Sequence, residues 1–251
     1  MNSPRLLVLD IENSYLLAGT WGLWNQNINL DLLLDYGKVL SVAAKWIGEK
    51  SIIFHKCDDK GFHKSIWKLL DEADAVITYN GRKHDIPLLN RELLKEGLGP
   101  YSPIKHIDLL ETMKKQFKFP SNKLAHITEE LGLGKKLDHG GFQLWVNCLK
   151  GDEDAWKKME KYNKQDVRLT EKLFHKVRAW CNLVVNYALY SSNGDVLCPH
   201  CGSDHLHKRG YYRTTSAIYQ KFNCQVCKGW SRTRYTEVTK EERKNILVKA
   251  N

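Results

Sequence analysis

The spacing of hydrophobic residues predicts strands in the first part of the chain and mostly helices after it. Residues 5–11, R-L-L-V-L-D-I, form a short apolar run that is typical of a buried strand. One helical face is predicted by Ile66, Leu69, Leu70 and Ala73, which recur at helical spacing. The pattern predicts further strands at 38–46, 50–54, 75–78 and 104–107, and further helices at 86–96, 109–117, 123–131 and 152–180.

Capping and turn residues set the ends of these elements. Ser121 and Asn122 are expected to cap the helix that begins at residue 123, and Gly97 and Gly132 are expected to end two helices. The longest predicted helix is expected to break near Asn163.

The order of the elements predicts the fold class and the domains. Strands followed by helices that alternate with strands are typical of a three-layer α/β or α+β domain with a mixed sheet. The turn-rich segment Ser191–Asp195 marks a boundary. We therefore expect a main domain at residues 1–190, a small module at 191–240 and a basic tail at 241–251.

Composition narrows the class of protein. The chain has 251 residues, of which 42% are hydrophobic, enough for one sizeable core and a small module. It has no apolar run of about 18 residues and reaches a charged residue early, so we expect a cytoplasmic protein without a membrane span or signal peptide. The formal charge is +10, and residues 191–251 alone carry 11 Lys or Arg against 5 Asp or Glu. This excess favours a polyanionic partner over charge that serves only solubility.

Two carboxylates end the first predicted strand. Asp10 and Glu12 are two residues apart and share a face, whereas Ile11 points into the core. The two negative charges repel each other unless a cation neutralises them, which indicates a metal site. The simpler alternative is that both carboxylates are solvated at the end of the strand. Asp85 follows a strand and the turn Tyr79-Asn80-Gly81, where it could cap a helix or join the same group.

A helix supplies the last candidate carboxylate. Tyr162 and Asp166 are four residues apart and share a helical face. Asp10, Glu12, Asp85 and Asp166 could converge on two divalent metals, and oxygen ligands suit Mg²⁺ or Mn²⁺. Two such metals can activate water for phosphodiester cleavage. Tyr162 would position that water, because its phenol is too weak an acid to act as the base.

Three segments carry a family resemblance. D-I-E at 10–12, Y-N-G-R-K-H-D-I-P-L-L at 79–89 and Y-N-K-Q-D at 162–166 resemble the Exo I, Exo II and Exo III motifs of DEDD 3′–5′ exonucleases in their tyrosine variant. The second has the spacing of family B DNA polymerase proofreading domains. The likeness covers about residues 5–187 and is greatest to phage-type DNA polymerase exonuclease subunits. It implies a ribonuclease-H-like fold, and host cytoplasm if the chain is phage-encoded.

The resemblance also implies roles for single residues. Asp10 would bridge both metals, Glu12 and Asp166 would complete one site, and Asp85 would support the other through water. Substrate contacts are expected from Asn80, Arg82 and Lys83, although Asn80 could instead be only a turn residue.

Three further residues near these motifs have expected structural roles. His84 stands where the Exo II motif usually has Phe, so we expect it to pack there, with a phosphate contact as the lesser alternative. Asp108 is expected to cap the helix at residue 109 rather than to act in the site.

Trp21 and Trp24 lie in a segment that these motifs do not explain. They could stack on nucleobases, but tryptophans this close in sequence more often pack in a core or a lid, which is our expectation.

Four of the seven cysteines form two C-x-x-C pairs near the C-terminus, Cys198/Cys201 and Cys224/Cys227. The pattern resembles a zinc ribbon that holds one structural Zn²⁺ through four thiolates. The alternatives are a disulfide pair, or a ligand from His200, His205 or His207 in place of a cysteine.

Cations alternate with aromatic residues around the cysteines, which favours nucleic-acid binding over a merely solvated surface. Arg209 and Arg213 are the predicted contacts.

Together these features predict a metal-dependent 3′–5′ exonuclease that acts on single-stranded or frayed DNA in replication or repair, with a DNA polymerase or another replication protein as a possible partner. An RNA exonuclease, a structure-selective nuclease and a non-catalytic polymerase-accessory module are the alternatives.

Overall fold

The computed structural model describes residues 3–182, 185–191 and 194–250. The chain divides into two compact units: Arg5–His175, and a second unit that contains the chain from Lys176 onward with its first residues. The predicted domain limits at residues 190 and 240 stay predictions. Ser192 and Asn193 of the predicted linker lie outside the described residues.

Up to residue 177 the chain begins with strands, then alternates helices with strands, and ends with four consecutive helices. The strands are β1 (Leu6–Asn13), β2 (Leu17–Ala18), β3 (Leu33–Asp35), β4 (Val39–Trp46), β5 (Ile53–Lys56), β6 (Ala75–Thr78) and β7 (Lys105–Asp108). The helices are α1 (Phe62–Asp71), α2 (Asp85–Lys95), α3 (Leu109–Gln116), α4 (Leu124–Glu130), α5 (Gln143–Leu149) and α6 (Glu153–Val177), with a 3-10 turn η1 (Leu30–Leu32).

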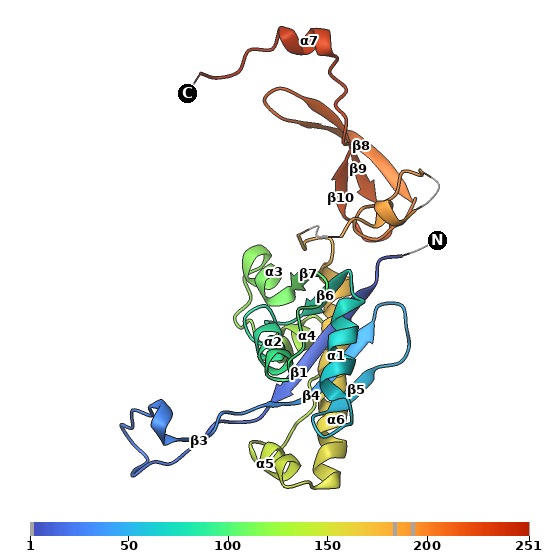
Figure 1. Ribbon diagram of the computed structural model, residues 1–251. Coiled ribbons are helices and arrows are strands. Elements are labelled where there is room, and N and C mark those ends of the chain that lie inside the picture. Colours follow the sequence, from blue (N-terminus) through green and yellow to red (C-terminus); the bar gives the residue numbers. More distant parts are fainter. Residues whose placement is uncertain (1–2, 183–184, 192–193, 251) are drawn as a thin grey trace. The chain divides into compact units, whose positions relative to one another are not determined.

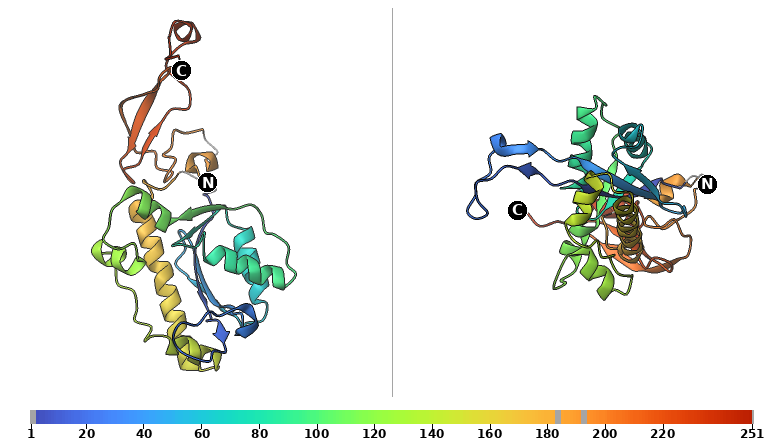
Figure 2. Two further views of the ribbon diagram at one scale, coloured as in Figure 1. Left: turned by 90° about the vertical axis from the view of Figure 1, so that its left-hand side faces the viewer. Right: turned by 90° about the horizontal axis from the view of Figure 1, so that it is seen from below.

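A five-stranded mixed sheet in the order β5-β4-β1-β6-β7 forms the centre of the first unit. β1 pairs antiparallel with β4 and parallel with β6, which pairs parallel with β7. Helices α1 and α2 cover one face of the sheet, and α6 crosses the other (Figure 1, Figure 2). The predicted α/β class with a mixed central sheet is confirmed.

The alternation along β1 determines which residues face which layer. Leu7, Leu9 and Ile11 belong to the core that packs against α1 and α2. Their neighbours Asp10 and Glu12 therefore point to the face that α6 crosses. Since Leu6 to Leu9 are almost completely buried, both carboxylates are held at the end of a rigid, central strand.

Four details of the sequence prediction are wrong. α6 is continuous, because the amide of the fully buried Asn163 binds Ser41 and Asp10 instead of disturbing the helix. β5 begins at Ile53, three residues later than predicted. The N-cap of α4 is Lys123, which makes no side-chain capping bond. Helix α5 and the pair β2–β3 were not predicted at all.

Residues 14–36 form an arm that projects from the sheet and contains β2 and β3 (Figure 1). Trp21 and Trp24 are 99% and 82% exposed, so the expectation that they pack in a core or lid is wrong. The arm's only charged residues are Asp31 and Asp35. Its other exposed large hydrophobic residues are Leu16, Leu17, Leu23, Ile28, Leu30, Leu34 and Tyr36.

The second unit contains a small antiparallel sheet in the order β10-β9-β8. Among its described residues, the elements are η2 (Tyr187–Tyr190), β8 (Leu206–Arg213), β9 (Ile218–Cys224), β10 (Trp230–Arg232) and α7 (Lys240–Lys244). Within the described parts of the chain, no helix has both the length and the apolar character that a membrane span needs.

Candidate active site and cysteine cluster

β1 and α6 bring three carboxylates together. Asp10 and Glu12 come from the end of β1, and Asp166 comes from α6, where it is 2% exposed. One oxygen from each lies within 4.8 Å of the others. This is the arrangement expected of a cation site, because like charges this close are unfavourable unless a cation or protons neutralise them.

Asp85 is held next to this group but apart from it. It is the first residue of α2, whose N-cap is His84, so the capping alternative for Asp85 is wrong. Its Oδ1 accepts a hydrogen bond from the Ile11 N–H at 3.3 Å, and the side chain is buried. Among the described residues, the tight carboxylate group does not include Asp85. Its charge still acts on Asp10 and Glu12, whose pKa values it raises.

The turn before α2 is fixed by Asp108. Its carboxylate accepts hydrogen bonds from the N–H groups of Asn80 at 2.9 Å and Arg82 at 3.1 Å. It also caps α3 as predicted, through the Leu110 N–H. Asn80 has a φ of 71°, and a Cβ on Gly81 would lie 2.5 Å from the Thr78 side chain. The turn therefore needs a residue that tolerates a left-handed backbone at position 80 and a residue without a side chain at position 81.

The carboxylates favour their protonated forms when no cation is bound. Burial raises the pKa of Asp10 well above its usual range, and the neighbouring carboxylates, Asp166 first, raise it further. Burial, followed by the charge of Asp166, raises the pKa of Glu12 to about 8. Burial raises the pKa of Asp166 as well, although Lys136 opposes this.

Lys136 is a site residue that the sequence prediction missed. Its Nζ lies 2.7 Å from Asp166 Oδ2 and 4.7 Å from the centre of the Tyr162 ring. Burial alone would lower the pKa of Lys136, but the contact with Asp166 outweighs burial and raises it. Lys136 lies outside helices and strands, so no periodic pattern marked it.

Aromatic side chains form one wall of the site. Tyr162 is buried, which raises its pKa to about 12, so it keeps its proton. The rings of His139 and Trp145 meet it edge-on, at 5.3 and 6.2 Å between centroids. Trp145 also makes a side-chain hydrogen bond with Glu12, which acts to lower the pKa of that carboxyl. Trp145 belongs to α5, so missing that helix concealed this contact.

Comparison with known protein families identifies the fold. The family model described as RNase_H superfamily matches residues 35–178. The chain belongs to the RNase_H superfamily. The matched range contains Asp85, Tyr162 and Asp166 and begins after Asp10 and Glu12.

Solved structures include one that is similar to this RNase_H-superfamily chain. The structure of the family B DNA polymerase from the hyperthermophilic archaeon Pyrobaculum calidifontis is similar over 71% of this chain, with a TM-score of 0.53 and 18% identity. At this identity the likeness shows a shared fold. The match covers 25% of the polymerase chain, so this chain corresponds to about a quarter of it. A search of curated proteins gives no match.

The predicted substrate contacts near α2 remain predictions in this RNase_H-superfamily protein. The Arg82 side chain is half exposed, donates to the His106 carbonyl at 2.8 Å and pairs with Glu111. Lys83 is exposed. His84 does not pack as expected: its side chain is 49% exposed, and the Asp85 carboxylate, 3.7 Å from its Nδ1, raises its pKa.

The four predicted cysteines meet in the second unit. Cys198 Sγ lies 3.6 Å from Cys227 Sγ, and Cys201 Sγ lies 3.6 Å from Cys224 Sγ. Four thiolates at about 2.3 Å from one Zn²⁺ have sulfurs about 3.8 Å apart, so the cluster fits that ion. Among the described residues, no histidine joins the cluster.

The pKa values within the cluster move in opposite directions. Burial opposes the ionisation of Cys224, but the N–H groups of Cys227 and Val226, together with the neighbouring thiols, lower its pKa to about 7. Burial raises the pKa values of Cys198 and Cys201.

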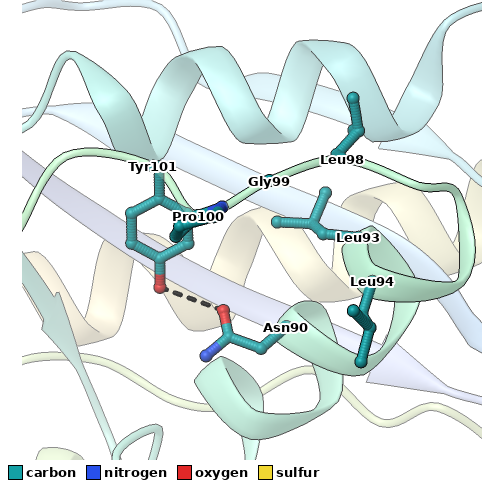
Figure 3. Close-up of a pocket in the computed structure, with 7 residues that line it drawn as sticks. All are labelled: Asn90, Leu93, Leu94, Leu98, Gly99, Pro100 and Tyr101. Carbon is teal, nitrogen blue, oxygen red and sulfur yellow. Dashed lines mark hydrogen bonds between the residues drawn. The ribbon is translucent and has the colours of Figure 1, made fainter.

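A cavity of about 490 Å³ lies away from the carboxylates (Figure 3). Tyr101 donates a hydrogen bond to Asn90 across it at 3.1 Å. Leucine side chains form most of the remaining lining, and none of the predicted site residues contributes to it. The cavity therefore offers no group for the chemistry predicted here.

Proposed function

We propose that this chain is a metal-dependent 3′–5′ exonuclease that hydrolyses phosphodiester bonds in DNA. The observation that carries the proposal is the meeting of Asp10, Glu12 and Asp166 beside a buried tyrosine. The likeness to a family B DNA polymerase supports it, because the segment 79–89 has the motif spacing of proofreading domains in that family. Replication or repair, with a polymerase as partner, is the setting that this likeness favours.

The carboxylates suit Mg²⁺ or Mn²⁺. Asp166 Oδ1 is buried and has no hydrogen-bond partner among the described residues, as expected of a ligand oxygen. We assign Asp10, Glu12 and Asp166 as direct ligands and Asp85 as a ligand through water. Two divalent ions held there would supply a nucleophilic water and stabilise the leaving oxygen.

The protein's own groups would prepare this chemistry. Tyr162 keeps its proton and would donate a hydrogen bond that orients the attacking water. Asn163 donates to Asp10 Oδ2 at 2.7 Å and is itself held by Ser41, so one oxygen of Asp10 has a fixed direction. Trp145 adds a side-chain hydrogen bond to Glu12. We also assign one structural Zn²⁺ to the four cysteines.

DNA labelled at either end tests the proposal. The purified chain with Mg²⁺ or Mn²⁺ should shorten single-stranded DNA from the 3′ end, and a 3′-terminal phosphorothioate should slow it. Asp166→Asn should reduce the rate by a factor of about 10³ or more, whereas Glu160→Gln, on the same helix but half exposed, should not.

Other outcomes would contradict the proposal. Equal rates in the two variants would show that the site is misassigned. Cleavage of RNA but not DNA would replace the substrate class, and inactivity on every substrate would refute the enzyme assignment.

A further inference from the structure

The small sheet of the second unit has an unusual composition. Its three strands, β8, β9 and β10, contain five Lys or Arg residues, five aromatic residues and no Asp or Glu. A solvated sheet surface would ordinarily mix both signs of charge. This composition indicates an anionic ligand with flat, stackable groups.

The register of the strands assigns these residues to faces. Tyr212 pairs with Tyr219, Arg232 pairs with Lys221, and Trp230 pairs with Asn223. Directly paired residues share a face, and alternation along β9 puts Tyr219, Lys221 and Asn223 on the same one. We name this surface the stacking face, and it consists of Tyr212, Tyr219, Lys221, Trp230 and Arg232.

Contacts within the stacking face agree with the register. The Arg232 guanidinium lies 3.9 Å from the centre of the Tyr219 ring and 5.5 Å from that of Tyr212. Lys221 Nζ lies 5.1 Å from the centre of the Trp230 ring. A guanidinium stacked on a ring keeps its N–H edges available for phosphate. Arg232 donates one hydrogen bond, to the Thr233 carbonyl, and its other N–H groups have no partner among the described residues.

A groove continues the stacking face along the edge strand β10. It has a volume of about 340 Å³, and its lining includes Trp230, Arg232, Arg234 and His200. Tyr212 and Trp230 are 49% and 52% exposed, so their rings are accessible beside it. The surface therefore has exposed rings, cations and a concave edge together.

We propose that the stacking face binds single-stranded DNA, with bases stacked on Tyr212 and Trp230 and phosphates paired with Lys221 and Arg232. Base stacking on aromatic side chains beside cations is the common means of binding single strands without sequence preference. The proposal rests on the proposed function in one respect, that the chain's substrate is DNA. The predicted contacts Arg209 and Arg213 lie elsewhere: Arg209 is in the irregular part of β8, and Arg213 is next to Tyr212 on the opposite face.

Fluorescence anisotropy with labelled oligothymidine of about 20 nucleotides, in buffer without divalent cations, tests the stacking face. Tyr212→Ala should weaken binding about 5- to 140-fold, whereas Tyr212→Phe should retain it. Tyr211→Ala is the matched control, because Tyr211 is adjacent, equally exposed at 47% and on the opposite face. Replacing Lys221 and Arg232 with Met should reduce the salt slope by about 1.4.

Tyr212→Ala should leave the affinity for blunt duplex DNA unchanged, because the bases of a duplex are already stacked on one another. Equal losses for Tyr211→Ala and Tyr212→Ala, or equal losses on duplex and single strand, would overturn the proposal. Zinc content of each variant checks folding of the unit. Hydrolysis is measured separately with Mg²⁺, so failure of the exonuclease assignment would be seen there and not in the binding data.

Discussion

Replacing Lys136 with Met removes the cation that neutralises the carboxylates when no metal is bound. Lys136 Nζ lies 2.7 Å from Asp166 Oδ2, and their side chains are 31% and 3% exposed. At an effective dielectric constant of about 20, this pair attracts by about 6 kcal/mol. Desolvation of both groups offsets part of that attraction, and Asp166 can take up a proton once the lysine is lost.

We therefore expect Lys136→Met to lower the free energy of unfolding by about 3 kcal/mol near neutral pH without metal. For a unit of this size the loss corresponds to a fall in Tm of about 6–12 °C. Added Mn²⁺ should restore most of it, because a bound divalent ion neutralises the same carboxylates and stabilises the folded state. Differential scanning calorimetry with and without MnCl₂ measures both effects.

Lys135→Met is the matched control. Lys135 pairs with Glu129 at 2.7 Å, but the two side chains are 78% and 56% exposed, so losing this pair should leave the transition unchanged. Equal destabilisation by the two variants would refute the reasoning, as would a loss in Lys136→Met that Mn²⁺ does not reverse.

Four further predictions follow from the same geometry. Burial raises the pKa of Glu12 from 4.5 to about 8, so its contribution to stability is complete below about pH 4.5 and is lost as the pH rises through about 8. Calorimetry should show this fall only without metal. Trp145→Phe keeps an aromatic ring but removes the N–H that bonds Glu12, so it should reduce the exonuclease rate about 10- to 100-fold. An unchanged rate would contradict that role. Trp21→Ala/Trp24→Ala should alter neither Tm nor affinity for single-stranded DNA, because the arm buries neither ring and has no cation; weaker binding would restore the stacking alternative. Cys198→Ser should lower the zinc content measured by mass spectrometry, and retained zinc would exclude the four-cysteine site.

The parts of the site that lie on regular elements could be predicted from the sequence. Asp10 and Glu12 share a face because β1 alternates, and Tyr162 and Asp166 share a face because α6 has helical periodicity. The central sheet is confirmed for the same reason, since its buried strands are continuous apolar runs. Local periodicity is sufficient to predict a contact when the two residues lie on the same strand or helix, because their spacing in the sequence then determines whether they share a face.

The missed parts depend on contacts between distant segments. Lys136 reaches Asp166 from a segment without secondary structure, where polar residues carry no directional pattern. Asn163 looked like a helix breaker because its partners, Ser41 and Asp10, lie more than a hundred residues away along the chain. Trp21 and Trp24 show the converse error, in which hydrophobicity suggested burial although both side chains are exposed on the arm.

The two oxygens of Asp166 explain how a lysine and a metal can use one carboxylate. Oδ2 accepts from Lys136, whereas Oδ1 is buried without a hydrogen-bond partner among the described residues. A cation bound to Oδ1 would therefore not have to displace the ammonium group. It would, however, lie close to a positive charge, which costs affinity while Lys136 stabilises the metal-free fold. Since both effects come from one contact, the loss of Lys136 should make the protein less stable without metal and more avid for it.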